Sequence, residues 1–190
     1  MSATTFPRVG GHPAFDLVDT VHWRLDDARA LDTLPDFPAV LDWCAEIDLV
    51  PDPGALRDLA SSAPETATRE HTAIIALREA VYAAVFEESP DAVALIAREH
   101  VRALDRSRLE RVGDRWGWHP PADLTAPRAA IALLAHDLLT SDLRAARQCG
   151  DDACGWVYLD TSPRHNRIWC TAAGCGNRNR VKRHHAKTRA

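Results

Sequence analysis

Residues 149–175 read CGDDACGWVYLDTSPRHNRIWCTAAGC and hold four of the five cysteines of this 190-residue chain. The cysteines form two pairs, each with four residues between its members, and 15 residues separate the pairs. This arrangement is typical of a closed tetrahedral zinc site. Two disulfide bonds are the alternative, but the first residues (MSATTFPR) contain no apolar signal segment, so we expect a cytoplasmic protein with reduced thiols. The predicted zinc ligands are Cys149, Cys154, Cys170 and Cys175.

The same stretch predicts a small treble-clef-like zinc finger. Cys149 and Cys154 form a knuckle in this prediction, and Cys175 lies in the first turn of a helix. Residues 156–159 have the composition of a strand, and residues 167–169 are its expected partner. Four thiolates leave no coordination position for water, so we expect one structural zinc ion on which this short segment depends to fold. Three aromatic residues are expected to form its small core, with stacking on nucleic-acid bases as the alternative: Trp156, Tyr158 and Trp169.

Charge is distributed unevenly along the chain. Residues 1–143 hold 13 Lys+Arg and 24 Asp+Glu, a net charge of −11. Residues 144–190 hold 10 Lys+Arg and 3 Asp+Glu, a net charge of +7. An acidic body with a basic end indicates an anionic partner for that end, with a solvated basic tail as the alternative.

Residues 176–190 have the composition of an exposed basic helix. Val181 is its only sizeable apolar side chain, so the helix would project from the zinc-binding segment. Its cations suit phosphate groups and its Arg and Asn side chains suit base edges, with a frayed tail or a surface for an acidic protein as alternatives. For Asn177 and Arg178 we favour local roles, in capping the helix and in lying near the anionic zinc site. The candidate nucleic-acid contacts are Arg178, Arg180, Lys182, Arg183 and Lys187.

The residues before the finger predict a mainly helical domain with a few strands. Residues 9–25 contain a Gly-Gly turn followed by apolar residues, and they predict a strand or the start of a hairpin. Residues 108–119 predict a hairpin that turns at Gly113-Asp114 and carries Trp116 and Trp118 on one face. Apolar residues at helical spacing predict five helices, over about residues 35–51, 52–59, 68–88, 90–104 and 131–138. Ser141-Asp142 predicts the cap of a further short helix that runs into Cys149.

These elements predict an α+β fold that is mainly α, with a helical domain over residues 1–140 and the zinc finger over residues 141–190. No apolar run approaches the ~18 residues of a membrane span, so we expect no integral membrane protein. The common nucleophile, phosphate-binding and metalloprotease motifs are missing from the sequence, so we do not expect an enzyme. Cys44 lies on the apolar face of a predicted helix and is expected to be a buried thiol, with a redox sensor as the alternative.

A group of polar residues near the front of the chain is a candidate lining for a ligand cleft. These residues lie on or beside the strand expected over residues 9–25, and ordinary surface and turn chemistry is the alternative. A small-molecule effector is the partner that such a cleft implies. The candidate pocket residues are His12, Asp16, Asp19, His22 and Arg24.

The string Cys175-Gly-Asn-Arg178, preceded by Trp169-Cys170 and by Asp160-Thr-Ser162, resembles the bacterial CGNR zinc finger. The segment GGHPAFDLVDTV, residues 10–21, resembles the start of the ABATE domain, which precedes this finger in proposed stress-induced transcription regulators. The resemblance implies zinc-ligand roles for the four cysteines and a DNA-contacting role for the basic helix. Four positions depart from the family pattern: Asp19 replaces a common Asn, Ile168 replaces an Arg, and Thr171-Ala172 replaces Ser-Met.

Three functions remain open at this point. A zinc-dependent, DNA-binding transcription regulator is favoured, in which the acidic body senses a signal or dimerises and the finger binds DNA. A homodimer suits this hypothesis because a single finger reads few base pairs, and a small-molecule effector suits it as the signal. An adaptor whose finger binds RNA or an acidic protein is the alternative. An enzyme with a pocket in the helical domain is the third.

Overall fold

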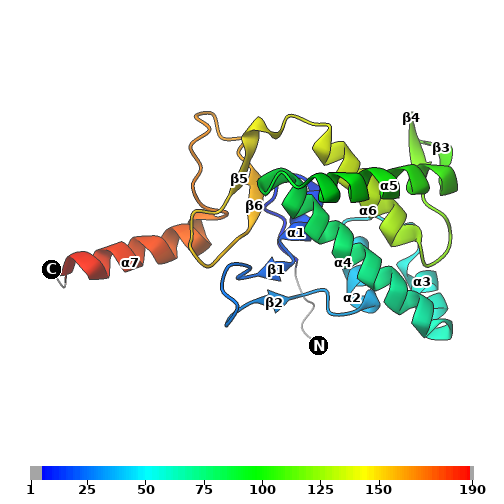
Figure 1. Ribbon diagram of the computed structural model, residues 1–190, viewed down its shortest axis with the longest axis horizontal. Coiled ribbons are helices and arrows are strands. Elements are labelled where there is room, and N and C mark those ends of the chain that lie inside the picture. The colour runs from blue at the N-terminus through cyan, green and yellow to red at the C-terminus, as the bar shows by residue number, and fades with distance from the viewer. Residues whose placement is uncertain (1–5, 189–190) are drawn as a thin grey trace. The chain divides into compact units, whose positions relative to one another are not determined.

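The structure divides into two compact units (Figure 1). It is a computed structural model, and it describes residues 6–188. Unit 1 comprises Met1–Thr33 and Asp142–Ala190, and unit 2 comprises Leu34–Ser141. The sequence-based division at about residue 140 differs from these units, because the first 33 residues group with the cysteine-rich end. Charge follows the units: unit 2 holds 10 Lys+Arg and 18 Asp+Glu, whereas unit 1 holds 13 and 9.

Unit 2, whose backbone is described throughout, consists of five helices and one hairpin. The helices are α2 (Phe37–Glu46), α3 (Pro53–Ser62), α4 (Pro64–Phe86), α5 (Pro90–Arg106) and α6 (Ala126–Leu139). Each has a proline in its first turn, where a backbone N–H would have no partner within the helix. The side chains of Asp36, Asp52 and Ser89 cap α2, α3 and α5 by accepting a backbone N–H. The five helices predicted over residues 35–138 are confirmed, whereas the short helix predicted from Ser141-Asp142 to Cys149 is only the turn η1 (Leu143–Ala145), which strand β5 (Ala146–Gln148) follows. No helix among the described residues is long and apolar enough to cross a membrane.

The core of unit 2 lies between α4, α5, α6 and α2. On α5 the buried face is formed by Ala92, Ile96 and Ala103. Val93 and Val101 lie outside this face and are 45% and 66% exposed. Glu99 is also buried on this face of α5, and it lies 3.7 Å from the Arg128 guanidinium of α6. The largest fully buried side chains of the unit include Trp43, Leu41, Ile74, Leu77, Ile96, Ile131 and Leu138.

The predicted hairpin is present in unit 2. Strands β3 (Arg108–Val112) and β4 (Arg115–His119) pair antiparallel. Gly113 occupies the turn with a φ of +61°, a conformation that a residue without a Cβ adopts freely. Trp116 and Trp118 lie two residues apart on β4, so they share one face, and both are exposed.

Unit 1 is built from short elements at both ends of the chain. They are α1 (Pro13–Val18), β1 (Val21–His22), β2 (Leu31–Asp32), η1 (Leu143–Ala145), β5 (Ala146–Gln148), β6 (Val157–Leu159), η2 (Ala172–Gly176) and α7 (Asn177–Thr188). The strand expected over residues 9–25 is wrong at Pro13–Val18, which is helical. His12 Nδ1 accepts the Ala14 N–H and Pro13 opens the helix, and these two signals outweigh the apolar run.

The N-terminal residues are hydrogen-bonded directly to the finger. Four bonds of 2.8–3.1 Å join them, from Leu159 N to Gly10 O, from Val157 N to Asp19 Oδ1, from Arg24 N to Cys154 O and from Trp156 Nε1 to Val21 O. Strand β6 pairs with β5, not with residues 167–169 as predicted. Residues 167–169 are not a strand, because the free edge of β6 is occupied by the N-terminal segment.

Candidate zinc centre and basic helix

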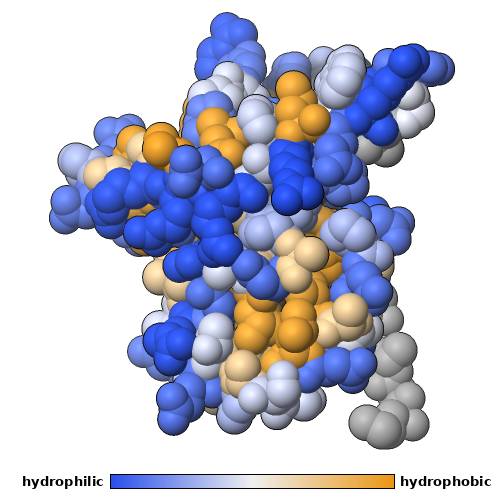
Figure 2. All heavy atoms as spheres, turned by 90° about the vertical axis from the view of Figure 1, so that its right-hand side faces the viewer, coloured by the Kyte–Doolittle hydropathy of each residue, from blue (hydrophilic) through white to orange (hydrophobic). Residues whose placement is uncertain are grey.

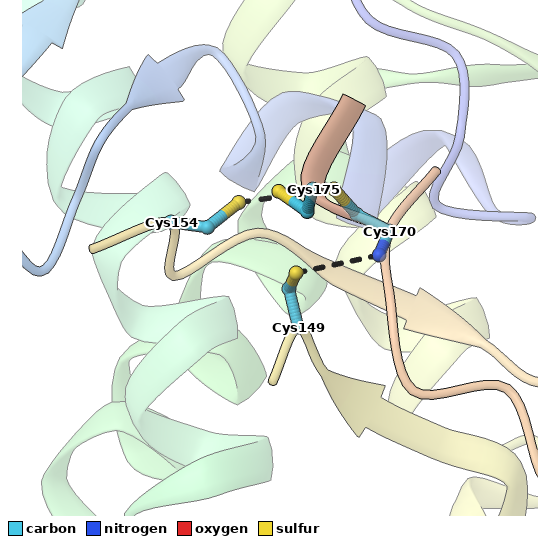
Figure 3. A group of neighbouring side chains, drawn as sticks. All are labelled: Cys149, Cys154, Cys170 and Cys175. Atoms are coloured by element: carbon cyan, nitrogen blue, oxygen red, sulfur yellow. Dashed lines mark hydrogen bonds between the residues drawn. The ribbon is translucent and has the colours of Figure 1, made fainter. Parts of the chain in front are cut away.

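The four clustered cysteines converge in unit 1 (Figure 3). Their Sγ atoms all lie within 4.8 Å of one another, and all four side chains are buried. Cys149 follows β5 and Cys154 precedes β6, so the pairing of these strands sets the spacing of the first two ligands. Cys170 ends the loop after β6, and Cys175 lies in η2 directly before α7.

The distances within the cluster fit a zinc ion rather than disulfide bonds. Cys170 Sγ lies 3.8 Å from Cys154 Sγ and 3.4 Å from Cys175 Sγ. Four Zn–S bonds of about 2.3 Å in tetrahedral geometry place the sulfurs about 3.8 Å apart, whereas a disulfide needs about 2.05 Å. Cys44 is buried separately in α2, as predicted, and burial raises the pKa of its thiol to about 12.

Four thiols this close cannot all ionise without a cation. Hydrogen bonding to Cys149 raises the pKa of Cys154 well above the usual thiol range, and burial raises the pKa of Cys175. A zinc ion removes this penalty because it binds the thiolate forms. The four cysteines therefore hold one zinc ion, and since they fill its coordination sphere, the ion is structural.

Arg178, in the first turn of α7, braces the cluster. Its guanidinium lies 2.9 Å from Cys175 Sγ and 3.5 Å from the Asp151 carboxylate. It also stacks over the Trp23 ring, 4.3 Å from the ring centroid. Asn179 Nδ2 donates to the same carboxylate at 2.7 Å. These contacts agree with the interpretation of Arg178 as a local brace of the zinc site, and they hold the start of α7 in place.

The aromatic residues form the small core of the finger, as predicted. Tyr158 is fully buried against the cysteines, and its hydroxyl donates to Arg167 O at 2.8 Å. Trp156 and Trp169 are partly buried and pack against the same cluster. The Arg167 guanidinium covers the Tyr158 ring at 3.9 Å and donates to Cys170 O. This core fixes the loop that delivers the third zinc ligand.

The polar residues near the front of the chain hold the N-terminal segment together. His12 caps α1, and Asp16 accepts the Gly10 N–H at 2.8 Å. Arg24 donates to the last carbonyl of α1 at 3.0 Å. His22 lines a cavity of about 270 Å³ beside the cysteines, and burial lowers its pKa. These separate contacts favour the alternative of ordinary structural chemistry over a shared ligand cleft.

Asp19 joins the two ends of unit 1. It is fully buried, and its Oδ1 accepts the Val157 N–H at 2.8 Å. Its Oδ2 is buried and has no hydrogen-bond partner among the described residues. Burial raises the pKa of this carboxyl well above its ordinary value. An Asn oxygen would accept the same N–H without a charge, which explains why either residue fits this position.

Helix α7 carries the candidate nucleic-acid contacts, and it extends away from the strands of unit 1 (Figure 1). Arg180, Lys182 and Arg183 are exposed. Among the described residues, the side chains of Arg180 and Lys182 have no hydrogen-bond or ion-pair partner, and Arg183 Nε donates to a backbone carbonyl of its own helix at 3.4 Å. Asn177 is the first residue of α7 rather than its cap. The side chain of Lys187 lies outside the part of the chain that the structure describes.

Three residues of the site were not among the sequence candidates. Trp23 has a φ of +56°, and its ring contacts the guanidinium groups of Arg29 at 3.5 Å and of Arg178 at 4.3 Å from the ring centroid. Asp151 is 1% exposed and binds two side chains of α7. Gly155 has a φ of +69°, and a Cβ there would lie 2.8 Å from a side-chain atom of Arg24. Asp151 lies between two ligands in the sequence and was detectable, whereas Trp23 has no local signal.

Two family models match the chain. Residues 146–188 match the CGNR zinc finger, and residues 11–142 match ABATE, described as "Putative stress-induced transcription regulator". A search of curated proteins finds no match. The ABATE match covers well over half of the chain, and all four zinc ligands lie within the other match. The chain therefore belongs to the ABATE family and ends in a CGNR zinc finger.

Proposed function

We propose that this protein is a DNA-binding transcription regulator whose zinc finger presents α7 to duplex DNA. The observation that carries the proposal is a set of exposed cations on a helix whose first turn is fixed to the zinc centre. These cations are Arg180, Lys182 and Arg183. Residues 176–190 contain no acidic side chain that would neutralise them. The description of the ABATE family supports the regulatory role.

Zinc makes α7 a preorganised contact. An isolated helix of 12 residues is marginal in water. Here Cys175, Arg178 and Asn179 fix its start, so the cations that follow are positioned before DNA arrives, which lowers the entropy cost of binding. The helix is about 18 Å long, and the major groove of B-DNA admits a helix.

The net charges of the two units favour unit 1 as the part that contacts DNA. Unit 1 has a net charge of +4 and unit 2 a net charge of −8, so the phosphate backbone attracts one and repels the other. The zinc ion has no catalytic role in this function, because four sulfurs leave no position for water or substrate. Reduced zinc thiolates suit the cytoplasm, where we place the protein.

An adaptor that binds RNA is the second candidate. Exposed cations bind any polyanion, so the charge of α7 alone does not separate the two functions. The major groove of an RNA duplex is too narrow for a helix, which favours DNA among double-stranded partners. Competition by single-stranded RNA that exceeds competition by duplex DNA would support the adaptor.

The test is the salt dependence of duplex binding by the zinc-loaded full chain, measured by fluorescence anisotropy. If the four basic residues that follow Arg178 up to Lys187 each neutralise one phosphate, log Kobs falls with log salt at a slope of about −3.6. Replacing Arg180, Lys182 and Arg183 together by Gln should reduce that slope by about 2.7.

The matched control removes the same charge from unit 2. It replaces Arg69, Arg98 and Arg115, which are exposed, by Gln. This variant should keep the slope of the unmodified protein. Equal slopes in the two triple variants, or no binding to duplex DNA, would contradict the proposal.

A further inference from the structure

Unit 2 contains a cavity whose lining includes no residue of the zinc finger. It has a volume of about 400 Å³ and lies between α3, the β3–β4 hairpin and the start of α6. Figure 2 faces the side on which α3 and the hairpin lie in Figure 1, and apolar side chains gather there in a patch surrounded by hydrophilic ones. A cavity of this size falls within the range that holds small ligands in proteins.

One side of the cavity is apolar. Leu56 and Leu59 of α3 and Ala126 of α6 line it, together with Pro120 and Pro121 after β4. Leu56 is 4% exposed, whereas Leu59 is 41% exposed. A ligand with an apolar body would cover the exposed part of Leu59. The two prolines have fixed φ angles, so this wall is formed before a ligand binds.

One charged face of the hairpin also lines the cavity, as does Asp52, whose carboxylate already caps α3 by accepting the Ala55 N–H. Arg108 opposes His119 in the strand register, and Glu110 lies two residues along β3 from Arg108. All three line the cavity. Residues two apart on a strand share a face and are separated by about 7 Å, so a cation and an anion stand side by side on this wall. Arg111 lies on the other face of the same strand and does not line the cavity.

These three side chains have no partner among the described residues, in hydrogen bonds, ion pairs or ring contacts. Arg106, which lines the same cavity, by contrast donates hydrogen bonds to Asp123 Oδ2 at 2.7 Å and to Thr125 Oγ1 at 3.0 Å. Arginine and histidine are donors that suit a carboxylate, and a glutamate accepts hydrogen bonds from an ammonium group. The cavity thus offers one place for each end of a zwitterion beside an apolar floor.

We infer that this cavity binds a small zwitterion with an apolar body, and that α-amino acids with apolar side chains are its ligand class. The carboxylate binds Arg108 and His119, and the ammonium group binds Glu110. The side chain of the ligand packs on Leu56 and Leu59. A ligand that connects the hairpin with α3 also stabilises the hairpin, since a two-stranded sheet is marginal alone. This site stands independently of the proposed DNA binding.

The test titrates L-leucine and L-phenylalanine into the zinc-loaded full chain and follows backbone amide shifts by NMR. Saturable shifts are expected over residues 51–59 and 106–121. Two analogues of leucine each retain only one of its charged groups, and so test the contribution of each group to binding. 4-Methylpentanoate lacks the ammonium group, and 3-methylbutylamine lacks the carboxylate. Each should bind at least about tenfold more weakly than leucine, because each leaves one charged group of the wall unpaired.

Two variants and a matched control locate the site. Arg108→Gln and Glu110→Gln should each weaken leucine binding at least about tenfold, whereas Arg111→Gln, on the opposite face of β3, should change it less than about twofold. Absence of saturable shifts with both amino acids up to about 20 mM, far above the concentrations at which small-molecule sites usually fill, would overturn the inference. Equal binding of the three leucine-related compounds, or an equal loss in Arg111→Gln and Arg108→Gln, would also overturn it.

Discussion

Replacing Arg178 by Gln tests whether the start of α7 is part of the zinc centre. The guanidinium lies 2.9 Å from Cys175 Sγ and 3.5 Å from the buried carboxylate of Asp151. A hydrogen bond to a charged group contributes about 1.5–3 kcal/mol. Because the Arg178 side chain is 39% exposed, we take the lower end, about 1.5 kcal/mol, which corresponds to about a tenfold loss of zinc affinity. Removing a partner of a metal ligand commonly costs 10–100-fold, so the two figures agree.

The assay is competition for zinc with a chromophoric chelator at neutral pH. Arg180→Gln is the matched control, since it removes the same charge two residues later from an exposed side chain that has no partner within residues 6–188. The control should keep its zinc affinity within about twofold of the unmodified protein. If Arg178→Gln also keeps it, or if both variants lose affinity equally, the contact with Cys175 does not support the zinc centre.

Three further predictions concern the rest of the molecule. A chain that starts at Leu34 lacks the four hydrogen bonds to the finger and should bind zinc at least about tenfold more weakly in the same competition assay; unchanged affinity would show that the finger folds alone. Trp43→Ala opens the core of unit 2 and should lower the free energy of unfolding in urea by about 3–5 kcal/mol; a loss under about 1 kcal/mol would contradict the packing. Asp19→Asn should raise Tm at neutral pH. Burial raises the folded-state pKa of Asp19 above its unfolded value. The stability of the unmodified protein therefore falls as pH rises from the ordinary to the raised pKa, and the Asn variant should lack this fall. Identical pH profiles of stability for the two proteins would contradict the burial of a charged Asp19.

The helices of unit 2 could be predicted from the sequence because their signals are local. Each has a proline in its first turn, and Asp36, Asp52 and Ser89 cap three of them. The partner of β6 could not be predicted, because the choice between residues 146–148 and 167–169 depends on which edge the N-terminal segment occupies. Helix α1 was missed because six residues are too few for helical periodicity to be visible.

The zinc ligands could be predicted because all four lie within 27 consecutive residues, at a spacing typical of zinc sites. The residues that contact the zinc ligands could be predicted only in part. Arg178 and Asp151 lie near the ligands in the sequence, but Trp23 reaches the site from the other end of the chain. The grouping of residues 1–33 with the finger follows from such long-range contacts, which composition and periodicity do not encode. The cavity beside Arg108 and Glu110 draws on several separate elements and was invisible for the same reason.

Whether zinc positions α7 for DNA is tested most directly by comparing duplex-DNA binding by the zinc-loaded chain and by the same protein after the metal is removed, at about 0.15 M salt, where surface charge is already well screened. The zinc-loaded chain should bind the duplex, and this binding should be lost on chelation and return when one equivalent of zinc is added back. Binding that persists after chelation would contradict the claim that the metal positions α7 for DNA. Failure of the zinc-loaded chain to bind would contradict the proposed function itself.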